Sequence, residues 1–249
     1  KPQLESLYGL IQASTYDNAK NLPSDYIPAL FGSYPKQLIA AYLRGQFVNL
    51  ASGSIYPDFD RVLNNSFESI QEREPLLVGM DFNRLKMSAV LYILRDGWPV
   101  AAEEITDGRD TPYMAKLLKE RYLDKGHAVT VVPDASGGNS SSKNASESDL
   151  SILRAHGLTV RCNPTNPAVA DRINAMNALI CNGGGVRRFK VNTLRCPKLT
   201  ESLEQQVYDK NGEPDKSNGL DHLNDAAGYP IAYLWPIVKK TAQVQQFRM

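Results

Sequence analysis

Three aspartates, each at the end or start of an apolar segment, are the feature that most constrains this chain. Asp81 ends the run 76–80, Asp134 ends the run 128–133, and Asp221 opens an apolar segment near the C-terminus. Ionised carboxylates accept hydrogen bonds but donate none, and several that converge on one point repel one another unless a hard divalent cation lies among them. Converging acids of this kind are the ligand set of a two-metal phosphodiesterase.

Periodicity and turn residues predict the order of the elements around these acids. Residues 76–82, 88–95 and 98–105 are short apolar or β-branched runs separated by polar turns, which predicts a three-stranded antiparallel meander. Residues 111–125 carry apolar positions at helical spacing after a Thr-Pro start. The strand that ends at Asp134 follows this helix, so we expect it to join the sheet in parallel through a right-handed crossover.

The second half of the chain continues the alternation of helices and strands. We expect helices at 146–156 (with Ser146 as the cap), 167–181, 197–208 and 221–235, and strands at 159–162 and 186–192. The acids then lie at the ends of the first and fourth strands and in a late helix. This β-β-β-α-β-α-β-α order predicts an α/β fold of the ribonuclease H-like kind, a mixed sheet in which three antiparallel strands precede parallel ones, flanked by helices.

With these residues in place, the chain resembles the nuclease half of the large terminase subunit of tailed bacteriophages, the motor protein that packages and cuts viral DNA. Three segments resemble its acidic motifs: Gly79-Met-Asp-Phe82, Val132-Pro-Asp-Ala135 and Asp221-His-Leu-Asn-Asp-Ala226. The N-terminal stretch, including Gly53-Ser-Ile-Tyr-Pro-Asp-Phe59, resembles the segment that leaves the terminase ATPase domain. The resemblance covers nearly all of the chain. It implies an ATPase end and linker at 1–60, a ribonuclease H-like nuclease domain at 61–238 and a flexible tail at 239–249.

The resemblance and the acids together predict a divalent-metal-dependent endodeoxyribonuclease that uses two Mg²⁺ or Mn²⁺ ions. Asp81 is expected to bridge the ions, with Asp134 and Asp221 each holding one side. Asp225 lies one helical turn after Asp221 and is a second ligand or an orienting group, so either acid qualifies as the principal third ligand. His222 is an auxiliary candidate that binds a metal, orients a water or only packs.

Each acid also has a purely structural interpretation. Asp81 can be a strand-end turn residue, Asp134 a turn former before a glycine-rich loop, and Asp221 a helix N-cap. Three such coincidences in the order of the family are less probable than one site.

The net charge of +1 does not indicate a nucleic-acid binder, so local clusters must supply the DNA contacts. Residues 186–198 hold five cations and no acid, and Arg188 and Lys190 share one face if 186–192 is a strand. Arg84 and Lys86 follow Asp81 closely and are the other candidates for contact with the cut strand. A solvated strand face and an ordinary hairpin turn are the respective alternatives.

Absent motifs narrow the function further. The sequence has no Gly-x-x-x-x-Gly-Lys-Ser/Thr phosphate loop, so this chain by itself is not expected to drive packaging. It has no Gly-x-Ser-x-Gly elbow, no zinc spacing among its histidines and no apolar run of membrane-spanning length. The expected partners are double-stranded DNA, the portal protein ring and the small terminase subunit, with no membrane. The expected location is the host cell cytoplasm, transiently on the procapsid.

Two other functions stay open at this point. The first is a module that grips DNA for the motor with little cutting activity of its own. The second is an actin-like or sugar-kinase phosphotransferase, which shares the first-strand aspartate but requires a glycine- and threonine-rich turn where this chain has Phe82-Asn-Arg-Leu-Lys86.

The two ends of the chain are expected to lie outside the catalytic unit. Residues 34–48 are predicted to be the main helix of the segment 1–60, which supplies no catalytic residue and whose deletion preserves cleavage. The tail 239–249 has too little apolar surface to form a core, and it either contacts the portal or is a frayed end.

Overall fold

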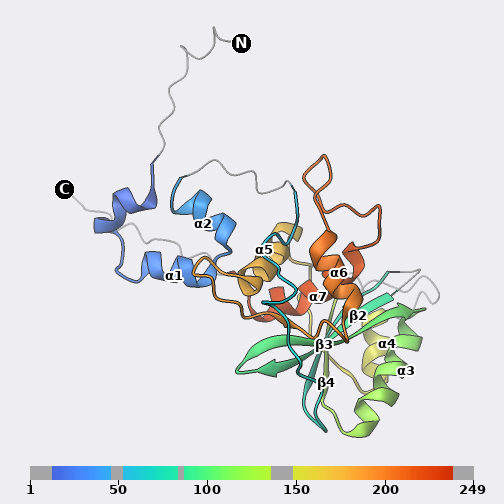
Figure 1. The fold of residues 1–249 in the computed structure, drawn as a ribbon. Coiled ribbons are helices and arrows are strands. Elements are labelled where there is room, and N and C mark those ends of the chain that lie inside the picture. The colour runs from blue at the N-terminus through green and yellow to red at the C-terminus, as the bar shows by residue number, and fades with distance from the viewer. Residues whose placement is uncertain (1–12, 46–52, 84–86, 136–147, 238–249) are drawn as a thin grey trace.

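The computed structural model describes residues 13–45, 53–83, 87–135 and 148–237, and these form a helix-flanked mixed sheet with a small helical annex (Figure 1). Six strands make up the sheet in the described residues, in the spatial order β5-β4-β1-β2-β3-β6. Their bounds are β1 (Leu76–Asp81), β2 (Met87–Arg95), β3 (Trp98–Gly108), β4 (Val129–Pro133), β5 (Thr159–Val160) and β6 (Lys190–Val191).

The strand pairing confirms the predicted fold class. β1, β2 and β3 form an antiparallel meander in which Val78 faces Leu91, and β4 lies parallel to β1 with Val131 beside Val78. The carboxyl ends of β1 and β4 therefore meet at one edge of the sheet, where the amide of Asp134 donates to the Met80 carbonyl at 3.0 Å. Two of the three predicted acids are brought to this edge by strand direction alone.

Helices cover both faces of the sheet (Figure 1). Those of the sheet body are α3 (Thr111–Arg121), α4 (Asp149–Ala155), α5 (Val169–Ile180), α6 (Pro197–Gln205) and α7 (Asp221–Leu234), with a 3₁₀ turn at Leu123–Lys125. Leu76, Val78 and Met80 of β1 pack against α3 and α4, whereas Leu77 packs with α5, α6 and α7. Successive strand residues point to opposite faces, so Asp81 belongs to the α7 face.

The backbone of α7 lies directly on β1. Gly79, which has no side chain, and Pro230, which has no backbone N–H, make this close contact possible. A Cβ at Gly79 would stand 1.9 Å from the carbonyl oxygen of Ala226, which leaves no room for any other residue. Pro230 lies inside α7 and has no N–H to bond that carbonyl. The Ala226 carbonyl therefore lies directly over Gly79. Helix α7 packs so closely on β1 that its first residues lie beside Asp81.

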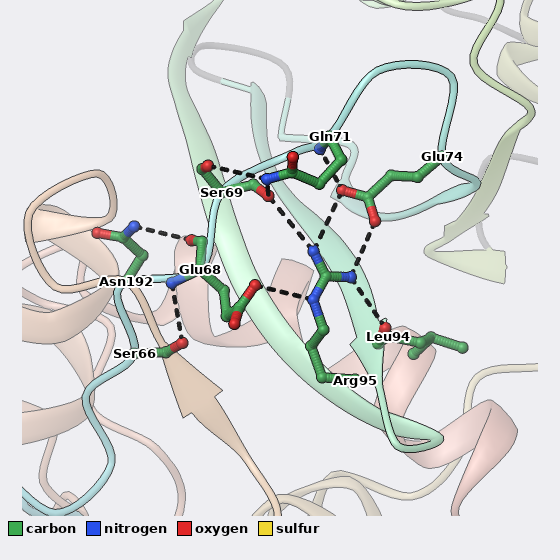
Figure 2. A network of polar contacts seen from close by, with 8 residues as sticks. All are labelled: Ser66, Glu68, Ser69, Gln71, Glu74, Leu94, Arg95 and Asn192. Atoms are coloured by element: carbon green, nitrogen blue, oxygen red, sulfur yellow. Dashed lines mark hydrogen bonds and ion pairs between the residues drawn. The ribbon is translucent and has the colours of Figure 1, made fainter.

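The segment before β1 is anchored by Arg95 at the end of β2 (Figure 2). Its guanidinium donates to Glu68 at 2.9 Å and to Glu74 at 2.8 Å, and the Asn192 amide donates to the Glu68 carbonyl at 2.9 Å. This network ties the entry of β1 to β2 and to the residues after β6, at the end of β1 opposite Asp81.

The annex, residues 13–45, contains a 3₁₀ helix (Thr15–Asn21), α1 (Tyr26–Ser33) and α2 (Lys36–Tyr42). It has its own small core of Leu30, Tyr34, Leu38, Ile39 and Leu43. Ile55 and Tyr56 instead belong to the core on the α7 face of the sheet. The predicted domain boundary at residue 60 stays a prediction.

Four of the differences between the predicted and the observed element boundaries have a clear local cause. The expected helix 34–48 is shorter, because Tyr34 precedes a proline and adopts an extended conformation, so that α1 ends before it and α2 begins after Pro35. The expected strand 186–192 is reduced to β6, because the amides of Arg188 and Phe189 bond Leu179 instead of a strand.

The other two differences concern helix ends. Ser148, not Ser146, caps α4 by accepting from the Ser151 amide, and Ser146 lies outside the described residues. Helix α6 ends at Gln205, because Val207 forms an isolated bridge to Ser54. Within the described chain, no helix combines the length and the apolar character that crossing a bilayer requires.

Candidate functional site

Asp81, the last residue of β1, is nearly buried, with its side chain 12% exposed. Burial raises the pKa of this carboxyl to about 6, and the negative charges of Asp225 and Asp134 add to the rise, while His222 opposes it. The effect of Asp225 and Asp134 on Asp81 means that acids from β1, the end of β4 and α7 share one electrostatic environment. An acid so placed is protonated more readily than a free aspartate, and a bound cation favours its ionised form.

Asp134 follows β4 and is fixed by the side chain of Asn166. The Asn166 amide donates to Asp134 Oδ1 at 2.5 Å, and its carbonyl oxygen accepts from the Ala135 amide at 2.8 Å. Both ends of one side chain therefore hold the turn that carries this carboxylate. The bond to Oδ1 fixes the rotamer of the acid at the edge of the sheet.

Asp221 is the first residue of α7, and its side chain is 5% exposed. Its Oδ1 is buried and has no hydrogen-bond partner among the described residues, and its Oδ2 lies 3.9 Å from His222 Nδ1. Leaving a buried carboxylate oxygen without a donor is costly, so such an atom in a folded protein calls for a specific explanation. A cation ligand is one that suits an acceptor-only group.

His222 connects the acid of β1 to that of α7. Its Nδ1 lies 3.2 Å from Asp81 Oδ2, and the Asn83 amide lies 2.7 Å from Nε2. With the amide donating to Nε2, the proton of a neutral ring is on Nδ1 and is donated to Asp81. In this arrangement His222 orients Asp81.

Asp225 lies one turn after Asp221 but has a different partner. Its Oδ1 accepts from Arg172 Nη2 of α5 at 2.6 Å. Burial raises the pKa of Asp225, Arg172 lowers it, and the charge of Asp221 raises it. Both acids of α7 thus face the site, but only Asp225 carries a bound guanidinium.

The structure brings the four predicted metal ligands to one region without assembling a finished cage. Within residues 13–45, 53–83, 87–135 and 148–237, no three His, Cys, Asp or Glu side chains stand at distances that would hold a metal ion. The donor set still fits a hard divalent cation, because it consists of carboxylate oxygens that repel one another and includes the unpartnered Oδ1 of Asp221. The assignment of these acids as catalytic residues and metal ligands stays a prediction.

A hollow of about 310 Å³ opens beside His222. It is bounded by β2 and β3 on one side and by α6 and the start of α7 on the other, and its polar lining includes Ser88, Thr106, Lys198 and Asn218. Ser88 is the residue that pairs with Asp81 across β1 and β2. The hollow therefore reaches His222 and the strand partner of Asp81, whereas the four predicted ligands are not among the residues that line it.

The predicted DNA-binding cations have structural contacts where they are described. Arg188 donates to the Gly32 carbonyl at 2.9 Å and stacks on Trp98 with 4.6 Å between the guanidinium carbon and the ring centre. Lys190 donates to the Leu63 carbonyl at 2.7 Å. Arg84 and Lys86 lie outside the described residues, as does the predicted tail 239–249. A DNA-binding role for these four cations stays a prediction.

Sequence reasoning missed two residues that hold the acids. Arg172 lies on the apolar side of its helix, at helical spacing from Val169 and Met176, and a charge in that position is a signal that was available. Asn166 gave no comparable signal, since an asparagine between prolines is typical of any loop.

The comparisons with known proteins agree on one family. A family model described as "Terminase RNaseH-like domain" matches residues 78–234. A second, described as "Terminase large subunit, T4likevirus-type, N-terminal", matches residues 1–62. No curated protein matches the chain.

Solved structures show the same fold at low sequence identity. A large terminase from a thermophilic bacteriophage is 22% identical, with a TM-score of 0.65 over 88% of this chain and 53% of that one. The P22 large terminase nuclease domain is 16% identical, with a TM-score of 0.54 over 75% of this chain and 95% of that domain. The large terminase nuclease of the thermophilic phage G20c is 19% identical, with a TM-score of 0.50 over 73% and 98% respectively. The chain therefore spans about half the length of the first of these proteins and nearly the whole of the two nuclease domains.

Proposed function

The chain belongs to the terminase large-subunit family and carries its RNaseH-like domain, and we propose on this premise that it is a divalent-metal-dependent endodeoxyribonuclease of a viral genome-packaging motor. The observation that carries the proposal is that Asp81, Asp134 and the two acids of α7, Asp221 and Asp225, meet at one edge of the sheet, where Asp221 keeps a buried oxygen without a partner in the described residues. Family membership also removes the basis for a phosphotransferase, which rested on the first-strand aspartate alone.

Asp81, Asp134, Asp221 and Asp225 are the residues that would hold two Mg²⁺ or Mn²⁺ ions. When bound, these ions lower the pKa of an attacking water and stabilise the leaving 3′ oxygen. The protein supplies the positions: His222 orients Asp81, and Asn166 fixes Asp134. No protein nucleophile is required, so a side chain need only bind, orient and shape the site.

The substrate class is double-stranded DNA, cut from a concatemer. We further propose the portal ring and the small terminase subunit as partners and the host cytoplasm as the location, with the enzyme transiently on the procapsid. The support is that residues 1–62 match the N-terminal model of the large subunit, the other half of such a motor.

The test is nicking of supercoiled plasmid by the purified chain with Mg²⁺, with Mn²⁺ and with EDTA. We expect cleavage with either metal, none with EDTA and none by Asp134→Asn. The matched control is Asp124→Asn, which changes an exposed acid that pairs with Lys119 at 2.5 Å on the other side of the sheet and should cut like the wild type.

A wild-type chain that binds DNA but never cuts it would contradict the proposal. It would favour the alternative of a DNA-gripping module with little activity of its own.

A further inference from the structure

Residues 53–56, which we call the strap, pair with residues 206–208 as two short antiparallel stretches. The Ile55 amide donates to the Gln206 carbonyl at 3.0 Å. Ile55 and Tyr56 are buried in the apolar cluster that α5, α6 and α7 share. The strap is therefore built into the same core as these helices, although the N-terminal family model extends through it to residue 62.

Gln206 connects the strap to the first turn of α7. Its backbone carbonyl accepts from the strap, and its side-chain Oε1 accepts from Asn224 Nδ2 at 2.7 Å. The same amide donates to the Ser202 carbonyl at 3.0 Å, and Asn224 is buried. Asn224 lies between Asp221 and Asp225 in the sequence, so the contacts that fix it also fix the turn that carries both acids.

The strap is bonded to α5 as well. The Asn177 amide of α5 donates to the Ile55 carbonyl at 2.8 Å in a buried contact. Arg172 lies earlier on the same helix and donates to Asp225 Oδ1 at 2.6 Å. The N–H of Ile55 is thus bonded toward α7 through Gln206, and its C=O is bonded to α5. One residue of the strap links both helices.

Tyr56, the next residue, lies close to the ion pair of Arg172 and Asp225. Burial raises the pKa of the Tyr56 hydroxyl, the charge of Asp225 raises it further and Arg172 opposes the rise. Tyr56 acts on Arg172 in turn. Because close-packed interiors transmit displacements, a movement of the Tyr56 ring shifts α5 against α7.

We propose that the strap is a positioning element of the nuclease site, which holds α5 and α7 at the separation at which the acids of α7 meet Asp81. A displacement of the strap from its N-terminal side then withdraws these acids. The inference rests on the proposed nuclease function. It makes Ile55 and Tyr56 positioning residues that act through their neighbours on α5 and α7. The sequence alone predicted that deletion of residues 1–60 preserves cleavage, and this inference predicts the opposite, because such a deletion removes the strap.

The first test is hydrogen exchange of the metal-free full chain, followed by mass spectrometry at residues 225–229 of α7. Tyr56→Leu removes the ring beside the ion pair, so these amides should exchange about tenfold faster than in the wild type. Tyr56→Phe keeps the ring and should exchange like the wild type. The matched control is Tyr122→Leu, which removes another buried tyrosine ring from the opposite face of the sheet and should leave the exchange of α7 unchanged.

The second test measures Mn²⁺ affinity by titration calorimetry and the nicking rate of supercoiled plasmid. Tyr56→Leu should weaken Mn²⁺ binding about tenfold and lower nicking in proportion, since groups that orient metal ligands contribute about 10–100-fold. Tyr122→Leu should match the wild type in both. Asn177→Ala removes the bond to the Ile55 carbonyl without removing a core ring, and it should change both quantities about threefold in the same direction as Tyr56→Leu.

Two results would overturn the inference. One is a cooperatively folded Tyr56→Leu chain whose α7 exchange and Mn²⁺ affinity match the wild type. The other is an equal loss in Tyr122→Leu, which would mean general loosening of the fold. If Tyr56→Leu does not unfold cooperatively, Asn177→Ala is judged by the same criteria. A wild-type chain that neither binds Mn²⁺ nor nicks DNA would overturn the proposed function instead, and the metal-free exchange of α7 would still decide whether the strap positions this helix.

Discussion

The sheet body and the annex differ in the size of their apolar cores and in how they are joined to each other. The sheet carries an apolar cluster on each face, with fully buried residues such as Val78 and Tyr92, whereas the annex has one small cluster of its own. Polar contacts join the annex to the body: Asn182 and Arg188 donate to the Gly32 carbonyl, and the Gly183 amide donates to Tyr34. Every predicted site acid lies in the body. The geometry of the site should therefore depend on the sheet and be insensitive to the annex.

The largest effect expected from this difference is on cleavage. Asp81→Asn should lower metal-dependent nicking on the order of 10³-fold, because a ligand contributes several kcal/mol to transition-state stabilisation. Leu43→Ala, in the annex core, should lower the stability of the annex by about 2–5 kcal/mol and leave nicking unchanged. Single-turnover plasmid cleavage and urea unfolding measure the two quantities. If Leu43→Ala reduced cleavage as strongly as Asp81→Asn, the annex would be part of the active unit.

A pair of glycine substitutions compares the two regions by packing alone. Gly79→Ala should displace α7 and with it Asp221, because the new Cβ would meet the Ala226 carbonyl at 1.9 Å. Gly183→Ala would meet side chains of the annex and no backbone: Ile39 at 2.5 Å, which can change rotamer, and the Phe31 ring at 3.3 Å. We expect Gly79→Ala to cost about 3 kcal/mol or more and Gly183→Ala about 1 kcal/mol. Thermal unfolding of both variants checks the order, and the reverse order would contradict the packing described for α7.

A smaller effect is expected at the turn after β4. Asn166→Ala should reduce nicking about 10–100-fold, since the side chain holds Asp134 through Oδ1 and holds the Ala135 amide. Asn163→Ala, in the same loop, serves as the control. The kinetic constants for Mn²⁺ activation give the measurement, and an Asn166→Ala enzyme with wild-type metal dependence would remove Asn166 from the site.

A further effect, which appears only without metal, concerns the stability of the sheet body. The pKa of Asp81 is about 6 in the folded chain and near 3.8 in the unfolded one, so the folded state binds the proton more tightly. Between these values the unfolded chain has lost its proton first, and the free energy of unfolding falls as the pH rises. Asp81→Asn has no carboxyl to ionise, so its free energy of unfolding does not fall in this way. The substitution should stabilise the metal-free protein by about 2 kcal/mol above pH 6 and should give no gain below pH 4. Denaturant unfolding in EDTA at several pH values tests this, and a gain that does not vary with pH would exclude the ionisation of Asp81 as its cause.

The strand pattern made much of the sheet predictable. The apolar runs of β1 and β2, and the helix between β3 and β4, indicated three antiparallel strands followed by a parallel one, because a short polar turn returns the chain antiparallel and a helical crossover returns it in parallel. The same rule placed Asp81 and Asp134 at one edge. The short β6 and the break between α1 and α2 were less predictable, because Leu179 and Pro35 decide them locally.

The sequence by itself determined which acids are candidate metal ligands, since it shows which aspartates follow or begin an apolar segment. It could not separate Asp221 from Asp225, which have the same charge and lie one turn apart. Tertiary structure separates them: Arg172, 53 positions before Asp225, binds one and leaves the other's buried oxygen without a described partner. A pattern within one helix reports which side is buried, but the neighbour that fills that side comes from another part of the chain. Ion pairing between α5 and α7 therefore exists only once both helices pack on the sheet.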